Sequence, residues 1–224
     1  MNLTFLAQTP LFRGIAPQDI TAMLGCLHGR EQSFSKGQLI YGAGECVTAM
    51  GMVLEGSVCI QRDDFWGNTS VLDSVQPGQM FAETYSCIPD EPLMVSVVAE
   101  KSCTVLFLET PHMLQVCSNG CGFHQRLVQN LLSISAQKNL ALSRKIAFTT
   151  AKTIRGRLLT YLSAQAAEHK SPSFSIPFNR QQLADYLNVE RSALSNELSK
   201  MQRDGLLTVE GRQFVLKVQE ENLL

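Results

Sequence analysis

The sequence predicts an α+β fold in which a β-rich front half is joined through one long helix to a small helical module. Three patterns predict it. Short β-prone runs broken by glycine or proline fill residues 30–110, and residues 123–150 contain neither glycine nor proline. Two short amphipathic helices with a tight turn between them can be traced over residues 179–205. The 224 residues are enough for one large domain or two small ones.

Residues 1–28 are expected to form a helical lead-in, because Pro17 stands near a helix start and apolar residues follow on one face. Short strands divided by glycine turns are typical of an antiparallel sandwich or barrel. We therefore expect residues 1–122 to form an antiparallel β-roll, a jelly roll of cupin type. The β-prone runs are 38–41, 49–54, 57–61, 69–72, 93–98 and 103–108.

The long helix expected over residues 123–150 carries apolar residues at spacings of three and four along two adjoining stripes. This is more apolar surface than one sheet can cover, and a seam between two subunits is its natural use. Asn139 and Ser135 would set the register of that seam. The alternative is a long helix packed within one subunit. The expected dimer residues are Leu127, Val128, Leu131, Leu132, Ser135, Asn139, Leu142 and Ile146.

Residues 179–205 are the most informative stretch. Leu194, Leu198 and Met201 recur at helical spacing along the second short helix, and Ala184 is small where the two helices would cross closely. This pattern predicts a helix-turn-helix unit, whose second helix enters the major groove of DNA. The alternative is a helical hairpin with no role in DNA binding.

The surroundings of this unit favour a winged helix-turn-helix domain over residues 151–224. A helix is expected over about residues 153–168, followed by a loop over residues 170–174. Residues 206–209 and 213–216 flank a turn at Gly211 and predict a hairpin, the wing.

The net charge of −1 does not by itself indicate a polyanionic partner, but the charge is unevenly distributed. Residues 1–150 hold 9 Lys and Arg against 12 Asp and Glu, whereas residues 151–224 hold 10 against 8. A weakly basic C-terminal part fits contact with DNA at that end.

Several classes of protein are not expected. The sequence shows no run of about 18 apolar residues and no signal peptide, so neither a membrane span nor secretion is expected. The seven cysteines are an odd number without a small disulfide framework, which favours reduced thiols and a cytoplasmic location. No Gly-rich phosphate loop, HExxH motif or G-x-S-x-G motif appears, so an enzyme is not expected.

The order of β-roll, long helix and winged helix-turn-helix resembles the family of cyclic-AMP receptor protein and FNR transcription regulators. The resemblance runs nearly end to end. It implies a dimeric, effector-gated regulator that binds double-stranded DNA, with RNA polymerase as a further partner if the chain is an activator. The motifs that carry the resemblance are residues 9–15, Lys36-Gly37, Gly44-Glu45, 54–58, 77–83, 180–184, 191–196, Leu198, Met201 and 205–207.

The resemblance also implies roles for polar residues of the two short helices. Arg191, Ser192 and Asn196 stand where such proteins read bases, and Arg191 is the best candidate for a bidentate contact to guanine. Arg180 and Gln181 are expected to contact the DNA backbone, and Lys200 to contact phosphates. The alternative for each is a solvated surface side chain.

The effector is expected to be a small molecule other than cyclic AMP. Family members that hold cyclic AMP use a glutamate on the ribose and, about ten residues later, an arginine and a serine on the phosphate. Glu83 fills the first place, as a pocket acid or as a turn residue that caps local amides, but Leu93 and Met94 fill the second and supply no cation. The expected effector pocket comprises Phe81, Glu83, Thr84, Tyr85, Leu93, Met94, Asn139, Leu142 and Ser143.

A redox, metal or haem sensor is the alternative function. Cys117, Cys121 and His124 would share one helical face, and thiolate with imidazole suits zinc or haem iron. Only these three ligands are visible, and Gly120 and Gly122 weaken a helix there. Ordinary burial of small thiols explains the same pattern, so no metal site is predicted.

Overall fold

The computed structural model describes residues 2–114 and 122–217. The chain forms two compact units, Met1–Ala136 and Gln137–Leu224. The predicted α+β class is confirmed, with an antiparallel β-roll, a long helix and a helix-turn-helix in that order. The long helix, α5 (Gly122–Thr150), begins in the first unit and ends in the second. Within the described residues, no helix is both long and apolar enough to cross a membrane.

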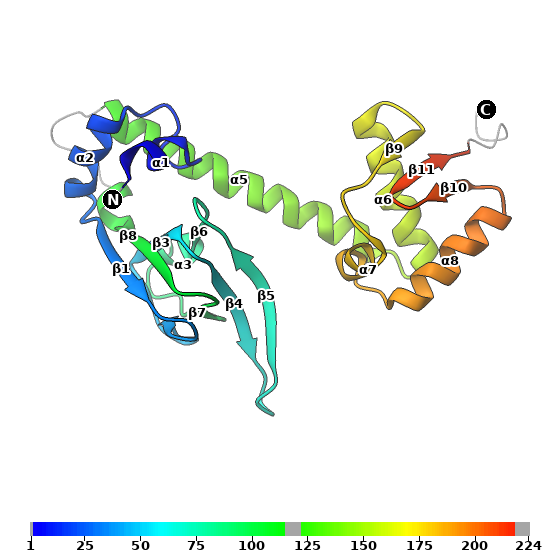
Figure 1. Ribbon diagram of the computed structural model, residues 1–224, viewed down its shortest axis with the longest axis horizontal. Coiled ribbons are helices and arrows are strands. Elements are labelled where there is room, and N and C mark those ends of the chain that lie inside the picture. Colours follow the sequence, from blue (N-terminus) through cyan, green and yellow to red (C-terminus); the bar gives the residue numbers. More distant parts are fainter. Residues whose placement is uncertain (1, 115–121, 218–224) are drawn as a thin grey trace. The chain divides into compact units, whose positions relative to one another are not determined.

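Two antiparallel sheets make the β-roll of the first unit (Figure 1). One sheet has the order β1 (Arg30–Phe34), β8 (Cys103–Glu109), β3 (Ala49–Glu55) and β6 (Met80–Phe81). The other has the order β2 (Leu39–Tyr41), β7 (Ser96–Ala99), β4 (Val58–Asp63) and β5 (Thr69–Val75).

The first sheet is buried on both faces, which explains why β3 and β8 are almost continuously apolar. Alternate side chains face opposite ways along a strand. Val53 and Phe107 therefore face the second sheet, in a core that also contains Phe81. The ring of Phe81 lies over Gly51 on the neighbouring strand, and a Cβ at Gly51 would stand 2.1 Å from that ring. Only glycine fits there.

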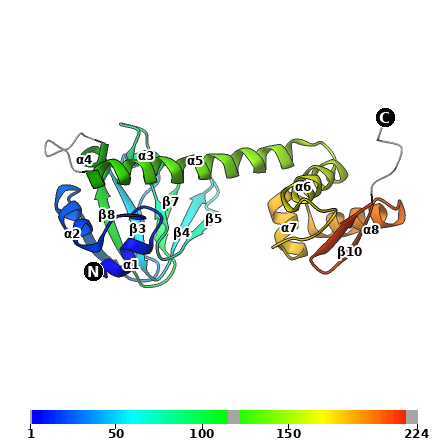
Figure 2. The same ribbon diagram turned by 90° about the horizontal axis from the view of Figure 1, so that it is seen from above.

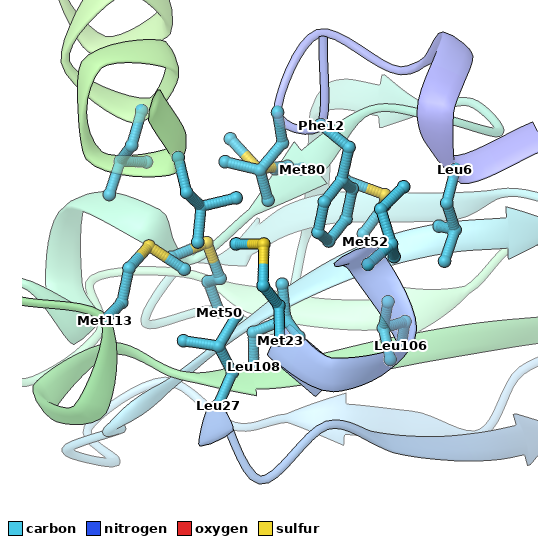
Figure 3. Close-up of a cluster of buried hydrophobic side chains, with 14 of the residues drawn as sticks. Leu6, Phe12, Met23, Leu27, Met50, Met52, Met80, Leu106, Leu108 and Met113 are labelled. Atoms are coloured by element: carbon cyan, nitrogen blue, oxygen red, sulfur yellow. The ribbon is translucent and has the colours of Figure 1, made fainter. Parts of the chain in front are cut away.

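The other face of this sheet is covered by helices (Figure 2). These are α1 (Leu3–Gln8), α2 (Pro17–Cys26), α4 (Thr110–Leu114) and the first turns of α5. Methionines fill much of this layer, and Figure 3 shows Met23, Met50, Met52, Met80 and Met113 in one cluster. Unbranched thioether side chains fill the irregular gaps between crossed helices and a twisted sheet.

The long helix does not use all of its expected seam residues in the same way. Leu127 and Leu131 are buried in the core of the first unit and are not available to a second chain. By contrast, Leu132, Leu142 and Ile146 are 69%, 61% and 65% exposed. The two stripes therefore have different uses, since one packs within the chain and the other is left uncovered.

The second unit packs α6 (Ile154–His169), α7 (Arg180–Leu187) and α8 (Arg191–Arg203) against a small sheet. The predicted hairpin is present as β10 (Leu207–Glu210) and β11 (Gln213–Leu216). The loop prediction for residues 170–174 is wrong at its end, because β9 (Ser173–Ser175) pairs with β11. Phe174 is buried there, with its ring stacked on Phe214 at 6.2 Å.

Candidate DNA-binding surface and effector site

The two helices of the helix-turn-helix are fixed at their ends by their own sequence. Asn179 caps α7, where it accepts from the amide of Gln182 at 2.9 Å, while the Gln182 side chain accepts from the amide of Asn179 at 2.9 Å. Asn188 ends α7 in the left-handed conformation, at φ 53°, which asparagine tolerates better than most residues. The left-handed conformation of Asn188 changes the direction of the chain after α7 and so begins the turn that leads to α8.

Arg157 on α6 ties the turn to the rest of the unit. Its Nη1 donates to the carbonyls of Leu187 at 3.1 Å and Asn188 at 2.8 Å, and its Nε donates to the carbonyl of Ala151 at 2.9 Å. These are the carbonyls that the end of a helix leaves without a helical partner. Arg157 therefore fixes the C-terminal end of α7 against the start of α6.

The exposed face of α8 carries the predicted DNA-reading side chains. Leu194, Leu198 and Met201 are buried on its other face, each at 2% exposure or less. Arg191, Asn196 and Lys200 are exposed, and Arg191 stands in the first turn, which in this kind of unit points toward base edges.

Glu190 is a functional candidate that the sequence interpretation missed. Its carboxylate caps α8, accepting from the amide of Ala193 at 2.8 Å and from the Ser192 hydroxyl. The hydrogen bond from Ser192, followed by the backbone amides, holds the pKa of Glu190 below its usual value. Because the Ser192 proton is engaged by Glu190, the Ser192 hydroxyl can face DNA only as an acceptor unless that bond is exchanged. A carboxylate directly before an apolar helical pattern was the available signal.

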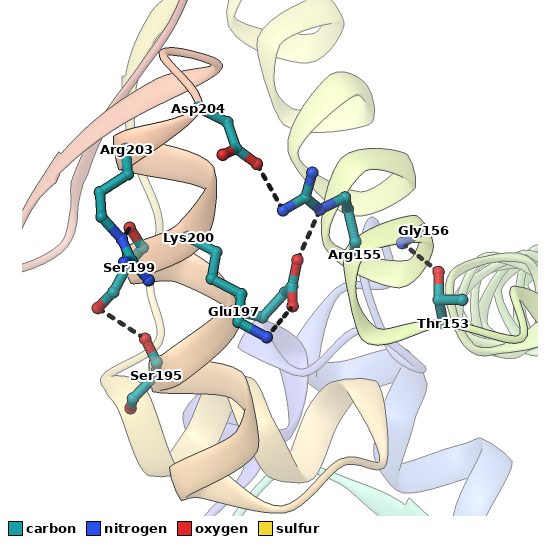
Figure 4. A network of polar contacts seen from close by, with 9 residues as sticks. All are labelled: Thr153, Arg155, Gly156, Ser195, Glu197, Ser199, Lys200, Arg203 and Asp204. Atoms are coloured by element: carbon teal, nitrogen blue, oxygen red, sulfur yellow. Dashed lines mark hydrogen bonds and ion pairs between the residues drawn. The ribbon is translucent and has the colours of Figure 1, made fainter.

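A polar network joins α8 to α6 (Figure 4). Arg155 donates to Glu197 at 2.6 Å and to Asp204 at 2.7 Å, and Lys200 lies 4.0 Å from the second oxygen of Glu197. The hydrogen bonds to Glu197 and Asp204 raise the pKa of Arg155. Arg155 thus braces both the middle and the end of α8, a role that spacing in the sequence alone does not reveal.

The two residues of α7 that are predicted to contact the DNA backbone, Arg180 and Gln181, differ in how firmly their side chains are held. Arg180 is half-buried with its guanidinium 5.4 Å from the centre of the Phe214 ring, and burial lowers its pKa. Gln181 is exposed and donates to Asp185 at 2.8 Å. Arg180 is therefore held over the wing hairpin, whereas Gln181 can reorient.

The expected effector residues of the β-roll are not equivalent. Phe81 belongs to the core, in edge-to-face contact with Tyr41 and Phe107, and Glu83 is buried at the start of α3 (Glu83–Ser86). Leu93 is buried at 3% exposure, whereas Met94 is 67% exposed.

The remaining expected effector residues are more open to solvent. Tyr85 is half-buried and Thr84 is exposed. Asn139, Leu142 and Ser143 belong to the second compact unit, and all three are exposed.

The alternative metal site is not assembled by the described residues. Cys117 and Cys121 lie outside them. His124 is buried, with its Nε2 3.3 Å from the carbonyl oxygen of His112. Within residues 2–114 and 122–217, no group of three or more His, Cys, Asp and Glu side chains could hold a metal ion. No observation on the described residues favours a metal sensor.

Comparison with known proteins agrees with this architecture. Residues 31–119 match the model of the cyclic nucleotide-binding domain, and residues 156–223 match the Crp-like helix-turn-helix domain. The Cyclic AMP receptor protein of Thermus thermophilus is 23% identical over 213 residues, which cover 93% of this chain and 94% of that protein. The Transcriptional activator protein FnrL of Cereibacter sphaeroides is 22% identical over 208 residues, covering 86% of this chain and 78% of FnrL.

This chain belongs to the CRP/FNR family. It is accordingly a DNA-binding transcription regulator with a cyclic-nucleotide-binding-like domain. Among solved structures, CprK complexed with OCPA has a TM-score of 0.58 at 14% identity, covering 87% of this chain and 88% of that one. The Catabolite Activator Protein of Thermus thermophilus has a TM-score of 0.50 at 20% identity, covering 93% and 94%. These two likenesses concern the fold alone.

Proposed function

We propose that this family member acts as a homodimer, in which two copies of α8 enter successive major grooves of one duplex. Residues 1–122 would sense an effector, residues 123–150 would join the subunits and residues 151–224 would bind DNA. The observation that carries the proposal is the two-sided α8, with one face buried in the core of its unit and the polar face exposed to solvent. No catalytic role is proposed, and the relatives named above are transcription regulators.

Arg191 is proposed to read a guanine, and Lys200 to contact a phosphate. The support for Arg191 is its exposed place in the first turn of α8. A bidentate arginine–guanine pair contributes about 1–3 kcal/mol of discrimination between bases, whereas a phosphate contact contributes equally to all sequences.

These two roles can be separated in one experiment. Preferred duplexes are first selected from a random pool with the full-length protein, and binding is then measured by fluorescence anisotropy at fixed salt. Arg191→Ala should lose most affinity for the selected duplex and little for random DNA. Lys200→Ala should weaken both alike. Equal losses for both duplexes with Arg191→Ala would refute the base-reading role.

A dimer is proposed on the uncovered stripe of α5. Leu132, Asn139, Leu142 and Ile146 follow the alternating spacing of a coiled-coil seam and are all exposed in the single chain. An operator with two related half-sites also requires two reading heads.

Cyclic AMP is proposed not to be the effector. A buried phosphate needs a cation or several donors. Instead of these, the segment after α3 presents Leu93, a buried aliphatic side chain, and Met94, which points to solvent. The residues in this place do not fit a cyclic nucleotide, and an apolar or weakly polar small molecule suits them better.

Native mass spectrometry of freshly purified protein tests this proposal directly, because a retained effector would be weighed. Calorimetric titration with cyclic AMP should show no saturable heat. Saturable binding of cyclic AMP at one equivalent per chain would overturn the proposal and leave the DNA-binding role untouched.

A further inference from the structure

The second unit contains a cavity of about 520 Å³ that lies apart from the reading face of α8. Four of its lining residues are aromatic, and they come from α5, α6, the segment before α7, and α7 itself. Their rings contact one another, with centroid distances between 4.8 and 6.2 Å. These residues are Phe148, Tyr161, Phe178 and Tyr186.

Polar groups of different kinds also line the cavity. Arg144 supplies a cation, and Glu168, which accepts from Gln165 at 3.3 Å, supplies an anion. Burial raises the pKa of Tyr161 to about 12, so its hydroxyl stays protonated at neutral pH. Burial also raises the pKa of Tyr186, and the charge of Arg144 opposes that change. Apolar walls with a few convergent polar groups are the usual makeup of a small-molecule site.

We propose that this cavity binds a planar aromatic molecule that carries one anionic group. The ring would pack against the aromatic wall that Phe178 and Tyr186 form, whose own rings are 4.8 Å apart and inclined by 31°. The anionic group would pair with the exposed guanidinium of Arg144, which has the geometry for a bidentate contact. This site is distinct from any effector site in the β-roll, because every lining residue falls between residues 144 and 186.

The cavity stays open in the proposed dimer, and in this respect the inference rests on the proposed function. In the seam spacing of α5, Asn139, Leu142 and Ile146 face the partner. Arg144 and Phe148 fall two residues from the nearest of these positions, on the outer side of the helix. A second copy would therefore leave the cavity accessible.

Ligand binding in the cavity would affect DNA binding through the helices that line it. The ligand would bridge the last turns of α5 to α7, and α7 packs directly against α8. A ligand that binds one arrangement of these helices better than another shifts the population toward it. DNA and the ligand would then change one another's affinity by the same factor.

The test uses the full-length protein and two probes of equal shape, 2-naphthoate and the uncharged 2-naphthamide, in calorimetric titrations. Naphthoate should bind at one equivalent per chain, and naphthamide about tenfold or more weakly, since a charge-assisted contact is lost. Arg144→Gln should weaken naphthoate to the level of naphthamide. Ala164→Phe, which adds a ring to the cavity wall, should abolish binding of both.

The matched control is Lys145→Gln, which removes a neighbouring exposed cation that does not line the cavity. It should leave naphthoate binding unchanged. Absence of naphthoate binding, or binding that survives both Arg144→Gln and Ala164→Phe, would overturn the inference. Duplex binding measured on the same preparations keeps the outcomes distinguishable, because a protein that binds DNA but not naphthoate loses only this second site.

Discussion

At the scale of single residues, the helix-turn-helix of α7 and α8 depends on a few side chains that bond to the free backbone groups at helix ends. The first amides and last carbonyls of a helix have no partner inside it. Asn179, Glu190 and Arg157 supply those partners at the start of α7, the start of α8 and the turn between them. None of the three needs to touch DNA to affect how DNA is read.

Asn179→Ala should destabilise the protein by about 0.5–2 kcal/mol, because it removes the side chain that caps α7. Denaturant unfolding followed by circular dichroism measures this. Gln202→Ala, at an exposed position on α8, is the matched control and should change stability by less than about 0.5 kcal/mol. Equal effects of the two substitutions would show that the cap contributes nothing.

Glu190 makes part of the stability depend on pH. Its pKa is lower in the folded protein than in the unfolded chain, chiefly because of the hydrogen bond from Ser192. Its contribution is therefore present above the ordinary glutamate pKa and lost as pH falls through the folded value. Glu190→Gln should be less stable than the natural protein at pH 7, and the difference should shrink below the ordinary pKa. A difference that stays constant down to acidic pH would exclude this role.

At the scale of elements, α5 shows how one helix serves two different surfaces. Its first turns bury Leu127 and Leu131 within the chain, while Leu132, Leu142 and Ile146 remain exposed. An exposed apolar stripe of this length is unusual for a helix that works alone. A second copy of α5 that covers these apolar side chains would remove them from water.

Leu142→Lys should convert the protein to monomers at micromolar concentration, since a charge would be buried in the seam. Sedimentation equilibrium measures the mass. Leu140→Lys is the matched control, because Leu140 is 52% exposed on the same helix but falls outside the seam spacing. If Leu142→Lys stayed dimeric, or if both variants dissociated alike, the proposed seam would be incorrect.

The spacing of apolar residues predicted the helices and strands that bury one regular face. It missed the elements in which few residues are buried or which are too short to show a period. Helices α5, α6, α7 and α8 were predicted within a few residues. Strand β1 was missed because only Phe34 of its residues is buried. Strand β6 was missed because two residues carry no period. The predicted loop wrongly includes residues 173–174, because their pairing partners in β11 lie about forty residues away.

The residues of the candidate site also fall into those that local spacing predicts and those that only the folded chain brings together. Arg191, Asn196 and Lys200 could be predicted because all three lie on one short helix, at positions other than those of its buried apolar residues. The tie of Arg155 to Glu197 and Asp204 spans more than forty positions in the chain and leaves no local pattern. The aromatic cavity is built from four separate elements, so only the folded unit brings its walls together.

At the scale of the whole molecule, DNA binding depends on where the charge lies, because the net charge of the chain is −1. An acidic first unit cannot attract a polyanion, so attraction must come from the basic end that holds α8. Binding to duplex DNA should then weaken linearly on a plot of log affinity against log salt, with a slope of about −0.9 for each phosphate neutralised.

Lys200→Ala should reduce the magnitude of that slope by about 1 for each chain that contacts the duplex, hence by about 2 for a dimer. Fluorescence anisotropy across a salt series measures the slope. Lys101→Ala, which removes an exposed cation from the β-roll, is the matched control and should leave the slope unchanged. A reduction of about 1 instead of 2 would mean that a single reading head engages the duplex, and an equal reduction for both variants would mean that the contact is not made through α8.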